Sequence, residues 1–224
     1  MRAWLFPLAL ASVFSCGFPV VRGEEYQIER LNRAPEGLPE AIRKELDPHG
    51  VRITGPDGPV CEIWFRKELQ TAADFQPTAS IKYPFTPGQL IGVVRLSDDA
   101  VYSDFRGQVV QPGLHTIRYA QEPQDGNHAS EIRDFLLLLP AAEDTAPGVL
   151  DDYDTLTEKS KESSEGEHPT VMPLLPPGNP SRTPKLTHED EGDLWVVNVP
   201  VHIAQDGKRS DILLRAVVVG MSEE

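Results

Sequence analysis

A short polar segment between two apolar runs carries the side chains best suited to chemistry. The run Gln124-Asp125-Gly126-Asn127-His128 brings a carboxylate, an amide and an imidazole into five residues. Asp125 and His128 could ligate a divalent metal or work as an acid–base pair if the turn folds them together. Their spacing matches no established ligand motif, however, and Asp-Gly is also the commonest turn chemistry. The segment therefore indicates either a plain turn or a binding site.

The remaining histidines add one more metal candidate. His168 precedes Pro169 in a polar stretch, and it would supply a third ligand if that stretch folds back over the sheet. His49 and His202 show no constellation with other chemical groups. The residues of the predicted metal site are therefore Asp125, His128 and His168.

Two arginines and an aspartate indicate either a structural network or a ligand pocket. Arg133 and Asp134 open an apolar run on opposite faces, and Arg118 lies in the preceding alternating segment. Pairing of each arginine with Asp104, Asp125 or Asp134 would fix the register of strands where sheets meet. If the groups converge in one pocket, they suit a carboxylate, a sugar or another polar small molecule. The candidate ligand-binding residues are Arg118, Gln124, Asp125, His128, Arg133 and Asp134.

Signatures of covalent and nucleotide chemistry are absent from the sequence. It contains no Gly-x-Ser-x-Gly elbow, no phosphate-cradling glycine loop and no dinucleotide fingerprint. Cys61 alternates with Ile63 and Phe65, which predicts a small core residue rather than a nucleophile. Trp64 and Trp195 lie in strand-like segments, where an exposed ring would stack on a sugar and a buried one would pack the core. We expect core packing for both, and the sequence leaves open whether the protein is an enzyme.

The first 23 residues have the organisation of an export signal. Arg2 supplies a small positive region, and an apolar run from residue 3 to residue 21 precedes a cleavage site before Glu24. Prolines break this run and acidic sequence follows it, which favours a cleaved signal over a transmembrane anchor. We expect an exported protein, either periplasmic or extracellular. The alternative is a lipoprotein anchored through Cys16, which stands in a loosely lipobox-like sequence.

The charge balance is strongly acidic. The chain has 21 Lys and Arg against 35 Asp and Glu, a net charge of −14. Removal of residues 1–23, which hold two arginines and no acid, makes the net charge −16. Nucleic acids and anionic membrane surfaces require basic patches, so we expect neither as a partner.

Alternating apolar residues predict many short strands and little helix. Leu38, Ile42 and Leu46 recur at spacings of four and predict a short amphipathic helix, and residues 150–164 predict a polar surface helix. These features favour one domain over residues 24–224, an antiparallel β-sandwich of Ig-like or jelly-roll-like type with a proline-rich strap at about 165–192. The strand-like segments are residues 51–54, 59–65, 90–96, 108–110, 114–120, 132–139, 195–203 and 212–219.

Several blocks in the middle of the chain carry a family resemblance. The main ones are Tyr102-Ser103-Asp104-Phe105-Arg106-Gly107-Gln108-Val109, Pro112-Gly113-Leu114-His115-Thr116-Ile117-Arg118-Tyr119 and Arg133-Asp134-Phe135-Leu136-Leu137-Leu138. With them the chain resembles a group of exported, uncharacterised bacterial proteins of the kind found in planctomycetes and similar environmental bacteria. His115 departs from the tyrosine of the Pro-Gly-x-Tyr-Thr pattern, which counts against a catalytic role. The resemblance implies no activity.

Together these features predict an exported, non-catalytic binding or structural module of the cell envelope. Its partner would be a small polar ligand, a glycan or an envelope protein. The alternative is a metal-binding or hydrolytic protein whose site forms around Asp125, His128 and His168, with a divalent metal as cofactor.

Overall fold

The computed structural model describes residues 26–122, 133–179, 181–205 and 207–222. Most regular structure is antiparallel β, so the mainly β, sandwich-like class predicted from the alternating pattern is confirmed. Within these residues two helices accompany the strands, α1 (Glu40–Arg43) and α2 (Tyr153–Lys161). α1 is shorter than the predicted amphipathic helix because Leu46 already leaves the helix to form a β-bridge with Arg66.

The larger sheet has seven strands, and all neighbouring pairs in it are antiparallel. The apolar run after residue 132 is buried on both faces because a helix covers its outer face, and it lies next to the edge of the sheet. In spatial order the strands are β1 (Gln27–Leu31), β2 (Gly50–Gly55), β3 (Gly58–Phe65), β5 (Leu90–Leu96), β8 (Gly113–Gln121), β9 (Asp134–Pro140) and β10 (Val171–Pro173).

The second sheet is built on a C-terminal hairpin formed by the last two predicted strand segments. β12 (Leu194–Gln205) and β13 (Lys208–Val219) pair along almost their whole length. β11 (Lys185–Glu189) pairs antiparallel with the first half of β12, and β4 (Leu69–Gln70) pairs parallel with its end. A separate two-stranded ribbon joins β6 (Tyr102–Ser103) and β7 (Val109–Val110).

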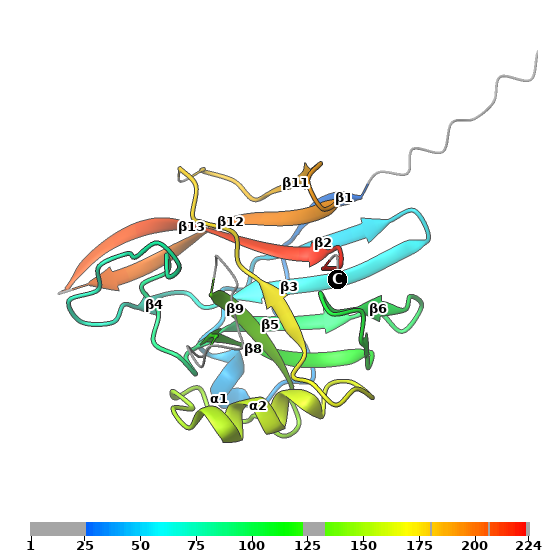
Figure 1. The fold of residues 1–224 in the computed structure, drawn as a ribbon, viewed down its shortest axis with the longest axis horizontal. Coiled ribbons are helices and arrows are strands. Elements are labelled where there is room, and N and C mark those ends of the chain that lie inside the picture. The colour runs from blue at the N-terminus through cyan, green and yellow to red at the C-terminus, as the bar shows by residue number, and fades with distance from the viewer. Residues whose placement is uncertain (1–25, 123–132, 180, 206, 223–224) are drawn as a thin grey trace, which may run out of the picture.

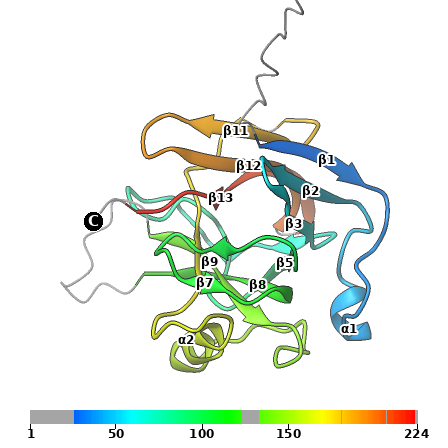
Figure 2. The same ribbon diagram turned by 90° about the vertical axis from the view of Figure 1, so that its right-hand side faces the viewer.

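One apolar cluster fills the space between the two sheets. Alternate residues of each strand point into it, among them Ile63 on β3, Ile117 on β8 and Leu214 on β13, all at most 1% exposed. Figure 1 shows the resulting layers, with the helices below, the larger sheet in the middle and the β12–β13 hairpin above. In the view of Figure 2 the larger sheet curls upward, so that β1 lies beside β11. The sheets are therefore held together by burial of a shared apolar face.

The two helices cover the opposite face of the larger sheet. Ile42 of α1 packs in a cluster with Trp64, and Leu156 of α2 packs in another with Leu139. Trp64 is fully buried, as expected, and its indole N–H donates to the carbonyl of Arg33 at 2.8 Å. Within the described residues no helix is long and apolar enough to cross a membrane.

The proline-rich segment runs from one sheet to the other. It contributes edge strands to both, β10 beside β9 and β11 beside β12, which the sequence did not predict. Between them Leu174 bridges to Ala216 of β13. Proline lacks an N–H and is restricted to sheet edges, so the short pairing stretches between the prolines fit only there.

Candidate functional site

The segment Gln124–His128 lies outside the described residues, so the metal and ligand predictions made for Gln124, Asp125 and His128 stay predictions. His168 is exposed, and its backbone N–H donates to Gln108 Oε1 at 3.2 Å. In the described part of the chain no three His, Cys, Asp or Glu side chains come close enough to hold a metal ion.

Arg118 is 1% exposed, and its five guanidinium N–H groups all donate hydrogen bonds. Nε and Nη2 bind the carboxylate of Asp144 at 2.6 and 2.8 Å. The other three bonds reach the carbonyls of Gly88, Gly148 and Ala146 at 2.6, 2.7 and 2.6 Å. With every donor engaged by the protein, Arg118 is a clamp that ties the loop after β9 to the outer face of the larger sheet.

The partner of Arg118 is not one of the acids that the sequence suggested. Alternation along β8 turns Arg118 to the outer face and Tyr119 to the core, where Asp134 also lies. Asp104 instead closes a turn, with its Oδ1 accepting the backbone N–H groups of residues 106 and 108 at 3.0 and 2.9 Å. Asp144 reaches Arg118 from a loop with no strand pattern, so periodicity could not reveal it.

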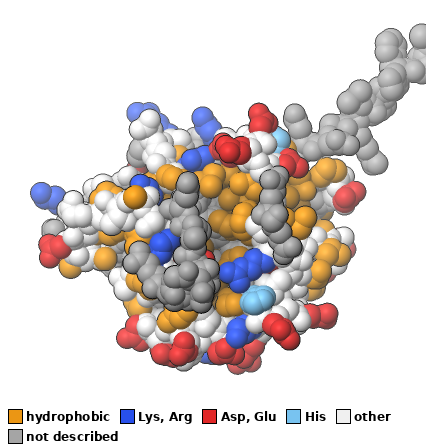
Figure 3. All heavy atoms as spheres, in the orientation of Figure 1, with side chains coloured by type: hydrophobic (Ala, Val, Ile, Leu, Met, Phe, Trp, Pro, Cys, Tyr) orange, Lys and Arg blue, Asp and Glu red, His pale blue; other side chains and the backbone are white. Residues whose placement is uncertain are grey.

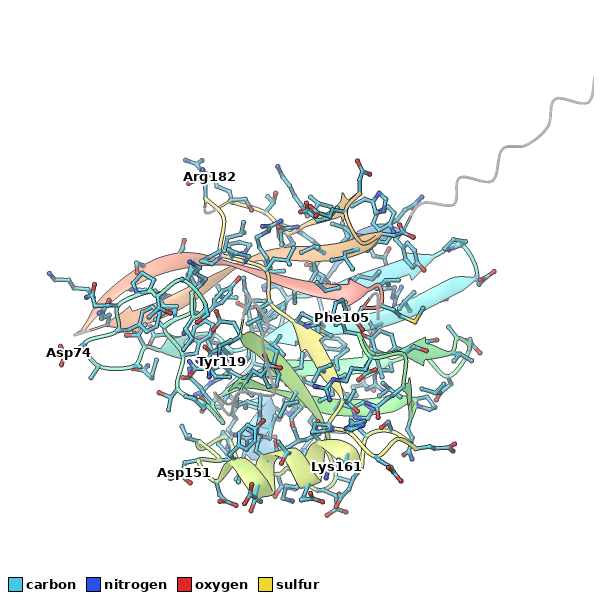
Figure 4. The ribbon with its side chains drawn as sticks, in the orientation of Figure 1. Asp74, Phe105, Tyr119, Asp151, Lys161 and Arg182 are labelled. Atoms are coloured by element: carbon cyan, nitrogen blue, oxygen red, sulfur yellow. The ribbon has the colours of Figure 1, made fainter. Side chains whose placement is uncertain are left out.

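Asp134 forms a buried polar pair with Tyr119 between the sheets. The Tyr119 hydroxyl donates to Asp134 Oδ1, and the backbone N–H of Lys82 donates to Oδ2 at 2.5 Å. Burial raises the pKa of Asp134, and burial together with that carboxylate raises the pKa of Tyr119. Figure 4 shows Tyr119 in the interior. This pair is part of the core polar structure rather than an open site.

Arg133 does not join Arg118 and Asp134 in one network through the described contacts. Its guanidinium donates to the carbonyl of Glu122, and its backbone N–H donates to Ser80 at 2.9 Å. The three predicted network residues therefore make three separate sets of contacts. Arg118 and Asp134 point to opposite faces of the sheet and cannot share one network.

A cavity of about 210 Å³ opens where the ends of β1 and β3 face the middle of β12. We call it the arginine cavity. Asp47 is the sole carboxylate among the described residues that line it. Its basic side chains are Arg30, His49, Arg66, Arg182 and His202.

An unpaired stretch of β12 explains why the cavity exists. β11 pairs with β12 as far as Asn198, and β4 begins to pair with it at Ile203. Between them, residues 199–202 pair on one side only, with β13, among the described strands. Pro200 lacks the N–H that a further strand would need. The start of β2 and the chain before β11 therefore face an open strand edge.

Each cavity histidine is oriented by an aspartate through Nδ1. His49 Nδ1 lies 2.8 Å from Asp47 Oδ1, which also accepts the backbone N–H of His49. His202 Nδ1 lies 2.6 Å from Oδ1 of Asp211, directly opposite on β13. A carboxylate at Nδ1 fixes the ring and leaves Nε2 as the nitrogen for a ligand.

Arg66 is the least exposed cation of the cavity, with 17% of its side chain accessible. Nη2 donates to Glu45 Oε2 at 2.5 Å, but the buried Nε has no hydrogen-bond partner among the described residues. Arg30 and Arg182 are exposed and form no ion pair with a described residue. Figure 4 shows Arg182 standing out from the chain before β11. A buried donor without an acceptor is costly, and Arg66 is the one residue of the cavity lining that carries such a donor among the described residues.

These residues escaped the sequence argument because they come from five distant segments. His49 and His202 show no constellation in sequence, yet both acquire an aspartate partner and meet at one cavity. The expectation for Cys61 is confirmed, since it is 2% exposed and burial raises the pKa of its thiol to about 12.

Comparisons of the chain with protein family models, with curated proteins and with solved structures found no match. A β-sandwich-like fold hosts many unrelated functions, so fold alone assigns none. Any function must be argued from the groups that the structure brings together, and the arginine cavity is the strongest such group.

Proposed function

We propose that this protein is a non-catalytic binding module of the cell envelope that holds an oxyanion in the arginine cavity. The observation that carries the proposal is Arg66, which lines the cavity together with two further arginines and whose buried Nε–H has no partner among the described residues. Carboxylate, phosphate and sulfate groups share the planar or tetrahedral oxygens that a guanidinium binds best.

The charge distribution supports an anionic ligand. The chain carries a net charge of −14, yet this cavity gathers three arginines and two histidines. Its carboxylate, Asp47, already accepts two hydrogen bonds from His49. Positive side chains that gather in one cavity of an otherwise acidic protein raise the local concentration of anions at that cavity.

The cavity volume limits the size of the ligand group. At about 210 Å³ it is below the range of pockets that enclose drug-sized ligands. It suits one anionic group, such as the carboxylate end of a sugar acid, with the rest of the molecule outside. Arg30 and Arg182, both exposed, would then contact the ligand at the rim.

The chemistry of the lining favours binding over covalent catalysis. No hydroxyl or thiol side chain is among the described residues that line the cavity, so no serine, threonine, tyrosine or cysteine nucleophile stands beside the two histidines. Export predicted from residues 1–23 would bring the module to the envelope, where acidic sugars and phosphate-bearing polymers are ligands of this chemistry.

Calorimetric titration with galacturonate, inorganic phosphate and sulfate tests the proposal, with galactose as the uncharged control. We expect at least one oxyanion to bind, galactose not to bind, and Arg66→Met to weaken the binding by about tenfold or more. The three anions also distinguish a sugar-borne carboxylate from a free phosphate or sulfate as the source of the oxyanion.

Arg106→Met is the matched control, because it removes an exposed arginine that does not line the cavity. It should leave the affinity unchanged. If Arg66→Met fails to fold, the exposed Arg30→Met and Arg182→Met variants decide the matter. Equal affinities in wild type and these variants, or no binding of any oxyanion, would contradict the proposal.

A further inference from the structure

A second depression, of about 680 Å³, lies at the other end of the same strands. We call it the aromatic groove. It is lined by the residue preceding β1, the start of β12, the end of β13 and the turn between β11 and β12. Figure 3 shows hydrophobic side chains gathered around the C-terminal end of the chain in this region, with acidic side chains above them. The groove is independent of the arginine cavity and shares no lining residue with it.

The rings of Tyr26 and Trp195 form one wall of the groove. Trp195 is tilted against Tyr26 with ring centroids 5.1 Å apart, and it stacks on His188, which does not line the groove, at 4.8 Å. His188 is the register partner of Trp195 on β11, and a bulge after Trp195 interrupts the pairing of β12 with β13 at this point. Tyr26 and Trp195 are half-buried and pack against the core cluster between the sheets, so the expected core packing of Trp195 is confirmed while part of its side chain stays exposed.

Apolar side chains extend this wall toward solvent. Val101 is 81% exposed and Met221 is 60% exposed, and both line the groove. They are two of the five large hydrophobic side chains that are exposed in the described part of the chain. Exposed apolar side chains beside accessible rings mark a binding surface rather than ordinary surface variation.

Carboxylates lie beside the ring wall of the groove. Asp190 and Asp193 belong to the β11–β12 turn and line the groove, and their side chains are 100% and 88% exposed. Asp193 Oδ1 lies 2.6 Å from Nε2 of His188, which ties the turn to the ring stack. No lysine or arginine occurs among the described residues that line the groove. The groove therefore combines ring faces with negative charge.

We infer that the aromatic groove binds an oligosaccharide that contains amino sugars. The apolar face of a pyranose ring packs on Tyr26 and Trp195, while the ammonium group of the sugar lies near Asp190 and Asp193. Aromatic faces attract both sugar C–H surfaces and cations, and the carboxylates add selectivity for the cation. Acidic sugars are disfavoured at this end, because no described lining residue offsets their charge.

The inference is tested by titrating the full chain with the glucosamine tetrasaccharide and following tryptophan fluorescence and heat. The N-acetylated tetrasaccharide and the glucose tetrasaccharide serve as uncharged comparisons. We expect saturable binding of the glucosamine oligomer, about fivefold tighter than that of either uncharged oligomer. Trp195→Ala should abolish the binding, and Asp190→Asn with Asp193→Asn should remove the preference for the amine.

Asp151→Asn is the matched charge control, since Asp151 is exposed on the helix side of the molecule (Figure 4) and should have no effect. Should Trp195→Ala fail to fold, the double aspartate variant still decides, because both carboxylates are exposed. Absence of saturable binding, equal affinity for charged and uncharged oligomers, or an unchanged preference in the double aspartate variant would each overturn the inference.

Discussion

The arginine cavity and the aromatic groove occupy opposite ends of the same strands and differ in almost every chemical respect. β1 begins at the groove, directly after Tyr26, and reaches the cavity near its other end, at Arg30. β12 passes the groove at Trp195 and the cavity at His202. One end gathers guanidinium and imidazole groups around a small space, and the other gathers rings and carboxylates around a space about three times larger, 680 against 210 Å³.

This difference shows how one pair of sheets can present two kinds of surface. In the middle, Ile63, Ile117 and Leu214 join the sheets through apolar packing and leave no room for chemistry. At two other places the pairing is interrupted, at the open edge in the middle of β12 and at the β-bulge after Trp195. Polar and aromatic side chains gather at these two places, where no packing partner fixes their type.

The largest expected effect is a loss of stability of the β-sheet fold, on which both the arginine cavity and the aromatic groove depend. Arg118→Met leaves Asp144 buried without its cation, and we expect the free energy of unfolding to fall by about 3–5 kcal/mol. Urea denaturation measures this loss, with Arg106→Met as an exposed control that should change stability by less than about 0.5 kcal/mol. A loss at Arg118 no larger than that of the control would show that the clamp is not a major support of the fold.

The next largest effect tests whether the arginine cavity and the aromatic groove bind their ligands independently. Arg66→Met should weaken galacturonate binding by about tenfold and leave glucosamine binding within about twofold of wild type. The double variant Asp190→Asn with Asp193→Asn should do the reverse, with about a fivefold loss for the amino sugar alone. Both ligands are titrated against all three proteins. Parallel losses of both ligands in either variant would show that the ends are not independent sites.

A pH series shows whether binding losses in acid come from the sites or from the fold. His115 is 3% exposed, and burial lowers its pKa below the ordinary 6.5. The folded protein thus takes up this proton less readily than the unfolded chain, so stability is present above pH 6.5 and is lost as the pH falls below it. We expect His115→Gln to flatten the fall in unfolding free energy between neutral and mildly acidic pH. If the unfolding free energy of His115→Gln falls with pH as steeply as that of the wild type, groups other than His115 cause the acid sensitivity.

The smallest expected effect concerns how the arginine cavity is positioned. Asp211→Asn removes the carboxylate that orients His202, and we expect oxyanion binding to weaken by about threefold because the pair is half-exposed. His202→Asn should lower the affinity to a similar degree, and adding Asp211→Asn to it should change nothing further. Additive losses would mean that Asp211 does not act through His202.

Much of the strand arrangement could be predicted from the sequence, because it follows from the alternation of apolar and polar residues and from the residues that favour turns. The strand over residues 90–96 and the hairpin over residues 51–65 match the predicted segments closely. The strands β10 and β11 could not be predicted from the sequence, because prolines surround these short pairing stretches. They form only where the edge of a folded sheet is available for pairing. The shortened α1 likewise depends on a tertiary bridge at Leu46.

The candidate sites were far less predictable than the strand arrangement. Asp144, the partner of Arg118, sits in a loop without periodicity. The groups of the arginine cavity lie between residues 30 and 202, and no local spacing connects residues that meet only through the tertiary fold. Sequence reasoning favours clusters along the chain, such as the run from Gln124 to His128, which lies outside the described residues.

The most direct test of the central proposal is the Nε–H resonance of Arg66, observed by NMR during a titration with galacturonate, phosphate and sulfate. Loss of one arginine signal in Arg66→Met assigns the resonance. If an oxyanion accepts this proton, the Arg66 signal moves downfield and saturates at the calorimetric affinity, while that of Arg118, already bonded to Asp144, stays in place. An Arg66 signal that does not move at saturating concentrations of all three anions would contradict an oxyanion site in the arginine cavity.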